Sequence, residues 1–416
     1  MSKNTIHYIC FLLISYCSFA QVEEIIPPDY INSIYFNGGT TESQLPIIAL
    51  GETITLEFDA LNGDEEDYYY EIKHYNFDWT PSYLVKSEYI EGFDEQRIRD
   101  YENSFNTLQT YSHYNLSIPN QYTKNIKVTG NYIITIYDDY DDIVFSRKFM
   151  VYKQQADVGV QIKRSRDVST IAEKQSVDIA ISSSTIQFVN PKKTVKTVII
   201  QNNNIKNAIT DLEPQYILAN ELTYRYTEAS SFFGGNEFLS FENKEIRAAN
   251  NGVQYIRLED LYQTYLYTNT SRANQKYTYN PDLNGNFFIN ALNSDQPETE
   301  ADYAWVHFAL QYPKLEEGSH IYVFGNFNNY EIEDATKLEY YEEEGVYSTA
   351  ILLKQGYYNY KYAIVNNKGD VDQYTIGGNF WQTENNYKVL VYYRELGARY
   401  DKIIGLGEIN SVGITN

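Results

Sequence analysis

Apolar side chains stand at every second position through much of this sequence. Ile54, Leu56 and Phe58 alternate with polar residues, and the same spacing recurs over residues 177–181 and 358–364. A period of two residues places such side chains on one face of a β-strand. The strand-like runs follow one another at short intervals, without long helical segments between them. The pattern therefore predicts an all-β chain of antiparallel sandwiches rather than a parallel α/β sheet.

Leu258, Leu261, Tyr262 and Tyr265 have the spacing of one helix face, but their run is too short to distinguish a helix from strands. Elsewhere the strand-like runs are separated by short segments that contain Asn, Asp or Gly, residues that favour turns. The clearest of these turns cover residues 61–64, 138–142, 342–345 and 366–370.

The first 20 residues have the features of a secretory signal peptide. Lys3 precedes an apolar segment over residues 9–16, and Ser18 and Ala20 form a small-x-small cleavage site. The apolar segment is too short to span a bilayer as a helix. We therefore expect cleavage between Ala20 and Gln21 and a mature protein outside the cytoplasm.

Composition narrows the classes of function further. Both cysteines, Cys10 and Cys17, lie within the expected signal peptide, so the mature chain should contain no disulfide. The formal net charge is −23, and it becomes −24 without Lys3. Such acidity disfavours nucleic acid and anionic lipid headgroups as partners and keeps a protein in solution. The sequence also has 43 tyrosines, which suit half-buried strands and wet interfaces.

Two polar segments, residues 153–157 and 293–300, divide the chain after the expected signal peptide. We expect three consecutive β-sandwich domains, of which the last is followed by a short tail. The expected boundaries are 1–20 for the signal peptide, 21–153, 154–294 and 295–397 for the three domains, and 398–416 for the tail.

The sequence offers no clear catalytic constellation. No two of its mature histidines have the i, i+4 spacing of a helical zinc pair, and the chain has no Gly-x-Ser-x-Gly nucleophile elbow and no phosphate-binding glycine loop. Asp78 and Asp100 are conceivable partners for two of these histidines, but hydrogen-bonded structural histidines are the favoured interpretation. The four histidines are His74, His113, His307 and His320.

Two further groups of residues have both a binding and a structural interpretation. Residues 138–142 and 282–286 cluster oxygen donors that calcium would suit, although neither matches the twelve-residue calcium loop, and solvated turns are favoured. Trp79 and Trp305 are predicted to fill the cores of sandwiches, whereas Trp381 follows a turn-rich segment and is expected to be the most exposed tryptophan.

Several blocks of sequence resemble, in order, the type IX secretion system plug protein family. The resemblance implies a non-enzymatic periplasmic protein that docks on the outer-membrane translocon barrel and occludes its periplasmic opening. It implies no catalytic residue, no cofactor and no small-molecule substrate. Candidate contact residues for such a partner are His74, Asp78, Trp79, Tyr330 and Trp381. The blocks cover residues 68–79, 87–93, 100–107, 111–114, 130–132, 147–152, 279–287, 304–310 and 321–327.

Residues 323–330, 345–347 and 356–362 resemble an early-set immunoglobulin-like domain, a group that includes glycogen- and starch-binding modules. Tyr330 stands where such modules usually have tryptophan. A carbohydrate-binding protein is therefore the alternative function, and it predicts exposed coplanar rings on one sheet face. We expect Tyr358 and its neighbours at every second position to pack in the core instead. A secreted hydrolase would need a concave pocket with a perturbed carboxylate or histidine.

Overall fold

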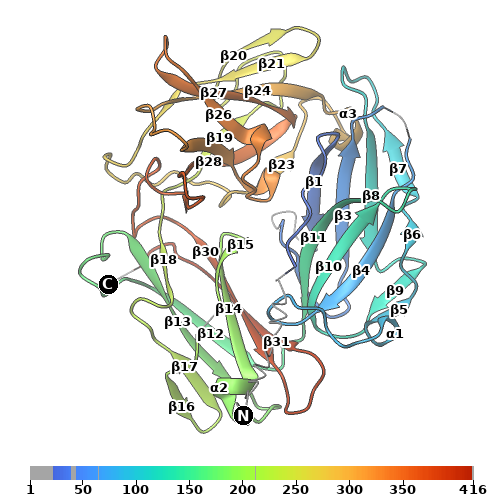
Figure 1. Ribbon diagram of the computed structural model, residues 1–416, viewed down its shortest axis with the longest axis vertical. Helices are drawn as coiled ribbons and strands as arrows, with labels where there is room; N and C mark the ends of the chain where they lie inside the picture. The colour runs from blue at the N-terminus through green and yellow to red at the C-terminus, as the bar shows by residue number, and fades with distance from the viewer. Residues whose placement is uncertain (1–21, 39–43, 64, 211, 415–416) are drawn as a thin grey trace, which may run out of the picture.

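The computed structural model describes residues 22–38, 44–63, 65–210 and 212–414. Strands account for 47% of the chain and helices for 5%, which confirms the all-β prediction. Figure 1 shows three lobes, which we call the first lobe (22–153), the middle lobe (154–234 with 385–414) and the third lobe (235–384). The expected signal peptide, with Ala20 and Gln21, lies outside the described residues.

The first lobe packs two sheets face to face. Phe58 lies at the centre of this core, with its ring centroid 5.1–5.3 Å from those of Tyr68, Tyr114 and Phe145. One sheet has the order β1 (Ile31–Asn37), β3 (Ile54–Ala60), β8 (Ser112–Ile118), β7 (Asp100–Asn103), and the other has the order β2 (Ile47–Ala49), β11 (Ile143–Tyr152), β10 (Gly130–Tyr137), β4 (Tyr69–Tyr75), β6 (Gln96–Arg97). A small pair, β5 (Ile90–Gly92) with β9 (Thr123–Ile126), follows α1 (Lys86–Tyr89).

The middle lobe also has two sheets, and its second sheet is completed by the C-terminal part of the chain. The alternating residues Val177, Ile179 and Ile181 are buried between the sheets, as their period predicted. The first sheet has the order β12 (Asp157–Arg164), β13 (Lys174–Ser182), β17 (Glu221–Tyr224), β16 (Tyr216–Leu218), with β18 (Ser231–Phe233) also on β13. The second has the order β15 (Asn204–Ile209), β14 (Val195–Gln201), β30 (Asn386–Tyr393), β31 (Lys402–Asn410), and α2 (Pro191–Thr194) precedes β14.

The third lobe is one curled sheet that folds back on itself. Its inner side chains include Tyr358, Tyr360 and Tyr362, which are buried in the core as expected. The strand order is β19 (Leu239–Glu242), β28 (Gly356–Val365), β25 (His320–Phe324), β26 (Lys337–Tyr341), β27 (Val346–Lys354), β24 (Tyr303–Gln311), β21 (Tyr262–Leu266), β20 (Val253–Leu258). Shorter elements are β22 (Asn269–Thr270) on β24, β23 (Phe287–Ile289) and β29 (Val371–Asp372) on β28, the α-helix α3 (Pro297–Glu300), and the 3-10 helices η1 (Asn326–Asn328) and η2 (Asp334–Thr336).

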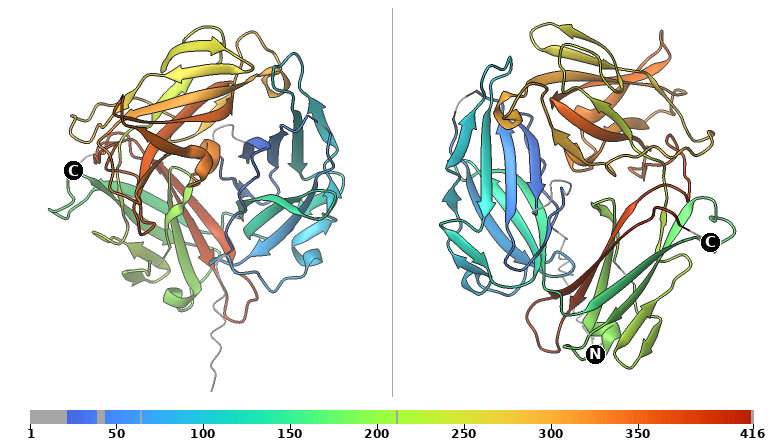
Figure 2. Two further views of the ribbon diagram at one scale, coloured as in Figure 1. Left: turned by 45° about the horizontal axis from the view of Figure 1, so that its top comes forward. Right: turned by 180° about the vertical axis from the view of Figure 1, so that it is seen from behind.

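Strand pairing differs from the expected domain boundaries in two places. Strands β19 to β23 lie before residue 295 but belong to the third lobe, and β31 lies inside the expected tail 398–416. In the middle lobe, β30 pairs along the whole length of β14, with Thr197 opposite Val391. Figure 2 shows these C-terminal strands (red) beside the green strands of the middle lobe. The reason is non-local pairing, because the C-terminal hairpin covers an edge that β14 would otherwise expose.

The run from Leu258 to Tyr265 with helical spacing is a hairpin. Its strands β20 and β21 pair antiparallel, and Leu258 lies opposite Tyr262. By contrast, the four turns expected at 61–64, 138–142, 342–345 and 366–370 contain turns in the structure. No helix in the part of the chain that the structure describes is long and apolar enough to cross a membrane.

The C-terminal hairpin should be necessary for the middle lobe. Ending the chain at residue 384 removes β30 and β31. The apolar side chains of β14 then lose the neighbouring β30 side chains with which they pack on both faces of the sheet. We expect this variant to be insoluble, or to lose the cooperative thermal unfolding of the full chain. A chain that ends at residue 411, beyond β31, is the control. If the variant that ends at residue 384 had the melting temperature of the full chain, the assignment of the hairpin to this lobe would be contradicted.

Candidate functional site

Two cross-strand pairs, one from each lobe, meet where the first lobe contacts the third. Asp59 on β3 lies opposite His113 on β8, and Tyr303 on β24 lies opposite Lys354 on β27. In β3, Ile54, Leu56 and Phe58 face the core of the first lobe, so alternation turns Asp59 toward the third lobe. The Asp59 and Lys354 side chains are 0% and 1% exposed.

Asp59 accepts hydrogen bonds at both carboxylate oxygens. Its Oδ1 lies 2.7 Å from His113 Nδ1, and its Oδ2 accepts from Lys354 Nζ at 2.6 Å and from Tyr303 Oη at 2.7 Å. Lys354 Nζ also donates to the carbonyl of Glu298 at 2.6 Å and lies 4.1 Å from the ring centroid of Tyr111. Both charged groups therefore have hydrogen-bonding partners in the protein, which buried charges require.

Electrostatics favour an ionised pair at this contact. Burial alone would raise the pKa of Asp59, but the Lys354 ammonium and His113 outweigh burial and hold that pKa below its usual range. Burial lowers the pKa of Lys354, and the Asp59 carboxylate opposes this shift. Because the carboxylate stays charged, it attracts groups from both lobes.

This set of side chains resembles an acid–base centre in composition, but it is closed to a substrate. Asp59 and Tyr303 are fully buried, and only 13% of the His113 side chain is exposed. Tyr111 covers the cluster while its hydroxyl donates to the carbonyl of Ala301 at 2.8 Å. Catalysis by proton transfer requires the base to reach a reacting group. The arrangement therefore serves as a polar lock between the first and third lobes. The sequence analysis did not predict a site at Asp59 and Lys354. The only sequence feature that could have indicated one is that each is a charged residue next to a strongly apolar strand position.

A second junction joins the first lobe to the middle lobe through Arg394. Its Nε and terminal nitrogen pair with the two oxygens of Asp401 at 2.8 and 2.7 Å, and it also donates to Asn76 Oδ1 at 2.7 Å. Asp401 in turn accepts from the backbone N–H of Phe77 at 2.9 Å. A planar guanidinium suits this bidentate contact better than an ammonium would.

Trp79 packs in the apolar layer beside this junction. It is 5% exposed and belongs to a cluster that includes Met150 of the first lobe and Leu390 and Tyr392 of the middle lobe. The Lys148 ammonium lies 4.6 Å from the centroid of its ring. The core position expected for Trp79 is confirmed, but the core is the one between two lobes.

The third junction, between the middle and third lobes, contains Tyr330. Its side chain is buried against Phe238 and Phe324, and its hydroxyl donates to the carbonyls of Asn202 at 3.2 Å and Asn284 at 3.4 Å. Asn202 belongs to the middle lobe and Asn284 to the third. Tyr330 therefore has neither a free ring face for a sugar nor a surface for a partner in this structure.

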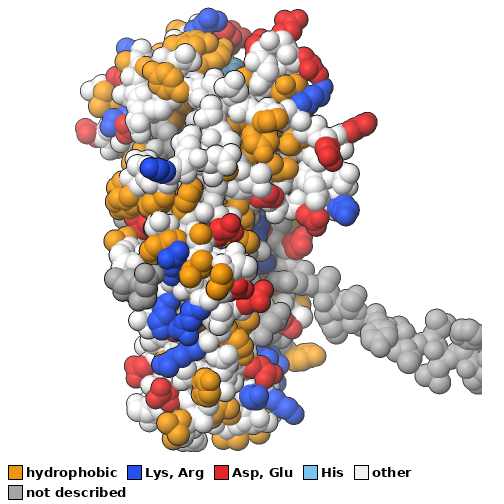
Figure 3. Space-filling view, turned by 90° about the vertical axis from the view of Figure 1, so that its left-hand side faces the viewer, with side chains coloured by type: hydrophobic (Ala, Val, Ile, Leu, Met, Phe, Trp, Pro, Cys, Tyr) orange, Lys and Arg blue, Asp and Glu red, His pale blue; other side chains and the backbone are white. Residues whose placement is uncertain are grey.

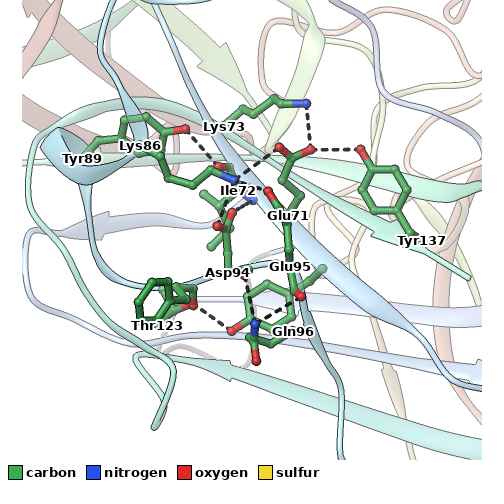
Figure 4. A network of polar contacts seen from close by, with 12 residues as sticks. Glu71, Ile72, Lys73, Lys86, Tyr89, Asp94, Glu95, Gln96, Thr123 and Tyr137 are labelled. Carbon is green, nitrogen blue, oxygen red and sulfur yellow. Dashed lines mark hydrogen bonds and ion pairs between the residues drawn. The ribbon is translucent and has the colours of Figure 1, made fainter. Parts of the chain in front are cut away.

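An ionic network near α1 fixes the surface of the first lobe (Figure 4). Lys86 Nζ lies 2.9 Å from carboxylate oxygens of Asp94 and Glu95 and 3.4 Å from Glu71. Burial would lower the pKa of Lys86, but the three carboxylates outweigh burial and raise it. Asp94 also accepts from the backbone N–H of Ile72 at 2.7 Å. The network holds α1 against β4 and gives this surface a fixed shape.

A groove of about 980 Å³, lined by polar and apolar side chains, lies between the middle and third lobes. Among its lining residues, burial raises the pKa of Asp282. Oδ1 of Asp282 accepts from the backbone N–H of Asn284 and closes a turn, and Oδ2 accepts from the backbone N–H of Phe238 on a distant segment. A hydrolase would need a free base beside a nucleophile here, and Asp282 does not offer one.

Neither of the two aspartates considered as histidine partners pairs with a histidine in the described residues. Asp78 Oδ1 accepts from the N–H and hydroxyl of Thr80, at 3.1 and 2.6 Å, and it does not pair with His74. Asp100 pairs with Asn115 across β7 and β8, so His113 has Asp59 as its carboxylate partner instead.

The exposures predicted for two tryptophans are wrong. Trp305 is 38% exposed, because Val306 and Phe308 fill the inner positions of β24 and alternation turns Trp305 outward. Trp381 is half-buried and is therefore less exposed than Trp305, and the guanidinium of Arg164 lies 4.7 Å from its ring centroid.

The oxygen clusters considered for calcium form turns. Asp138 Oδ1 accepts from the backbone N–H groups of Tyr140 and Asp142, both at 2.9 Å. Both oxygens of Asp282 also accept from backbone N–H groups, one of them within a turn, as described above. Within residues 22–38, 44–63, 65–210 and 212–414, no group of three or more His, Cys, Asp or Glu side chains could hold a metal ion.

Comparisons with known proteins identify a matching family and a similar solved structure. The sequence model of the family described as "Type 9 secretion system plug protein 1st domain" matches residues 31–153. The crystal structure of a hypothetical protein from Parabacteroides merdae is 34% identical to this chain, with a TM-score of 0.88. The match covers 93% of this chain and 98% of that one. A search of curated proteins finds no match.

Breaking the Asp59 cluster should destabilise the protein strongly. Lys354→Met leaves a buried carboxylate without its main counter-charge, and we expect a loss of about 3–5 kcal/mol in the free energy of unfolding. The Asp59→Asn/Lys354→Met double variant should recover part of that loss, because no charge then remains unpaired. Lys368→Met, on an exposed turn of the third lobe, is the control. Urea denaturation gives the free energy of unfolding of the wild type and of the three variants. Equal stability of Lys354→Met and the control would contradict the lock.

His74 should make the protein sensitive to mild acid. Its ring lies among Tyr89, Tyr132 and Tyr400, with Nε2 3.3 Å from the carbonyl of Thr129, and burial lowers the pKa of His74 to about 4. In the unfolded chain a histidine binds its proton near pH 6.5. As the pH falls from about 6.5 to about 4, the unfolded state gains protons first, so stability falls by up to about 3 kcal/mol.

His74→Phe keeps a ring in this site and removes the titration. We expect this variant to lose most of the pH dependence of the urea unfolding free energy between about pH 4 and pH 7. The control His320→Gln, at the start of β25, should keep this pH dependence. If the pH dependence persists in His74→Phe, a group other than His74 is responsible for it.

Proposed function

The chain belongs to the type IX secretion system plug protein family, and we propose that it closes the periplasmic opening of the outer-membrane barrel through which type IX cargo leaves the cell. The observation that carries the proposal is the family match over the first lobe, residues 31–153. The proposed location is the periplasm, at the inner face of the outer membrane. Cleavage between Ala20 and Gln21 remains a prediction of this location.

The three junctions support a stopper that moves as one body. A barrel wide enough for folded cargo leaks unless a large object fills its mouth. Lobes linked only by flexible segments would leave gaps, because small polar interfaces between domains permit relative motion. Here polar contacts join each pair of lobes, buried at Asp59 and Tyr330 and half-buried at Arg394. Since closure must be reversible, we expect the contact with the barrel to be polar and wet.

A non-enzymatic role agrees with the family, which is a secretion-system component rather than a known enzyme family. The one acid–base cluster described above is closed to substrates. We therefore assign the buried charges to assembly of the three lobes.

The carbohydrate-binding alternative predicts exposed coplanar rings, and the third lobe does carry rings on an outer sheet face. Tyr265 stacks on Tyr255 at 4.4 Å and on His307 at 4.1 Å between ring centroids. Rings stacked in this way cover one another's faces and present their edges to solvent. A sugar platform needs free ring faces side by side, so this row favours a cross-strand ladder over a glycan site.

Deleting the gene should make the outer membrane permeable to a large antibiotic that it normally excludes. The leak should disappear when the translocon barrel is also deleted, because the open pore is then gone. Growth inhibition by the antibiotic measures both effects. Unchanged permeability in the single deletion would count against a plug.

A further inference from the structure

The negative charge of this protein is confined to two of its three lobes. The first lobe has 23 acidic and 9 basic residues, a formal charge of −14, and the third has 22 and 10, a charge of −12. The middle lobe has 11 acidic and 13 basic residues, a charge of +2. In Figure 3, lysine and arginine side chains gather in the lower half of the view, where the middle lobe lies. The repulsion of anionic surfaces expected from the total charge therefore does not hold for this lobe.

The end of the middle lobe that lies opposite the third lobe (Figure 1) also exposes large apolar side chains. We call this end the tip and define it as residues 186–194, 213–220 and 395–398. The backbone N–H of Phe188 donates to Asn220 Oδ1 at 2.9 Å, and that of Arg394, the junction residue just before the third segment, donates to the Thr194 carbonyl at 2.9 Å. Figure 1 shows α2 and β16 together at this end. Its exposed apolar side chains are Val189 at 53%, Tyr216 at 66%, Ile217 at 45%, Leu218 at 77% and Leu396 at 73%.

Cationic side chains stand among these apolar ones. Lys192 and Lys193 are both exposed on α2. Lys192 has one carboxylate neighbour, Glu213 at 3.4 Å, and Lys193 lies in no ion pair among the described residues. Exposed aliphatic and tyrosine side chains beside lysines are the pattern of a protein surface that rests in the headgroup region of a bilayer.

We propose that the tip of the middle lobe contacts an anionic lipid surface. Its apolar side chains enter the headgroup region, its lysines lie near lipid phosphates, and the acidic third lobe lies at the opposite end of the molecule (Figure 1). The proposal rests on the proposed function only for its location, because a stopper at a barrel's mouth lies against the surrounding leaflet. The contact is peripheral, in keeping with the short apolar segments involved.

Charge complementarity favours lipid over a second copy of this chain. Two copies that met at their tips would bring Lys192 and Lys193 of one copy toward the same lysines of the other, and the like charges would oppose their association. The tip residues stand on three separate segments, at the ends of strands, which suits a broad and chemically uniform surface. Anionic headgroups attract lysines at short range and do so less at high salt.

Vesicle sedimentation with the purified full-length mature protein tests the proposal without the barrel. We expect binding to phosphatidylethanolamine–phosphatidylglycerol vesicles, little binding to phosphatidylcholine vesicles, and a drop of about fivefold or more between roughly 0.05 and 0.5 M salt. Lys192→Glu/Lys193→Glu and Leu218→Ser/Leu396→Ser should each weaken the binding by about fivefold or more. Thermal unfolding confirms that these surface variants are folded.

Lys276→Glu/Lys368→Glu is the matched control, because it changes the charge equally on exposed sites of the third lobe. This control should bind as the wild type does. Three results would overturn the proposal, namely no binding at low salt, equal loss in the control, or a dimer in solution that Leu218→Ser dissociates. The permeability test of the proposed function does not depend on these outcomes, so the two can fail separately.

Discussion

Each lobe of this protein buries the face of a sheet against a neighbouring lobe, and the polar groups on that face must find partners across the contact. This requirement governs the positions of Asp59, Arg394 and Tyr330, the residues at the centres of the three junctions. The three lobes contain no cysteine to link them covalently, so ionic and apolar contacts join them. A buried charge that lost its partner would cost more than the intact pair contributes, which makes such contacts specific for one arrangement of lobes.

The same requirement explains why some strands lack alternation. In β14, nearly every side chain is buried, because one face of its sheet covers the core of the middle lobe and the other covers the first lobe. A sheet buried on both faces reads as a continuous apolar run. The C-terminal hairpin supplies the strand that pairs with β14, so the middle of the chain and its C-terminal part depend on each other for folding. For a protein proposed to close a pore, this interdependence keeps the body in one shape.

Two kinds of surface remain after the lobes have assembled. The first and third lobes carry nearly all the net negative charge, whereas the middle lobe is close to neutral and has an apolar tip. A composition averaged over the chain hides this difference, since it adds residues from segments that fold into separate bodies. The proposed lipid contact depends on the difference and not on the total charge.

The sequence by itself determined the strand content, most turns, the burial of residues such as Val177 and Tyr358, and the family, because these depend on neighbouring residues and on ordered blocks. It could not decide which lobe receives β30, which way Trp305 faces, or that Asp59 meets Lys354. The last two residues are 295 positions apart in the chain, and no local pattern links them. Only the tertiary structure decided these points, because strand pairing and the packing of lobes bring together residues that share no periodicity. Because the outer face of its sheet is also buried, Asp59 lies at the centre of a junction, although its position in the strand pattern is that of an ordinary polar residue.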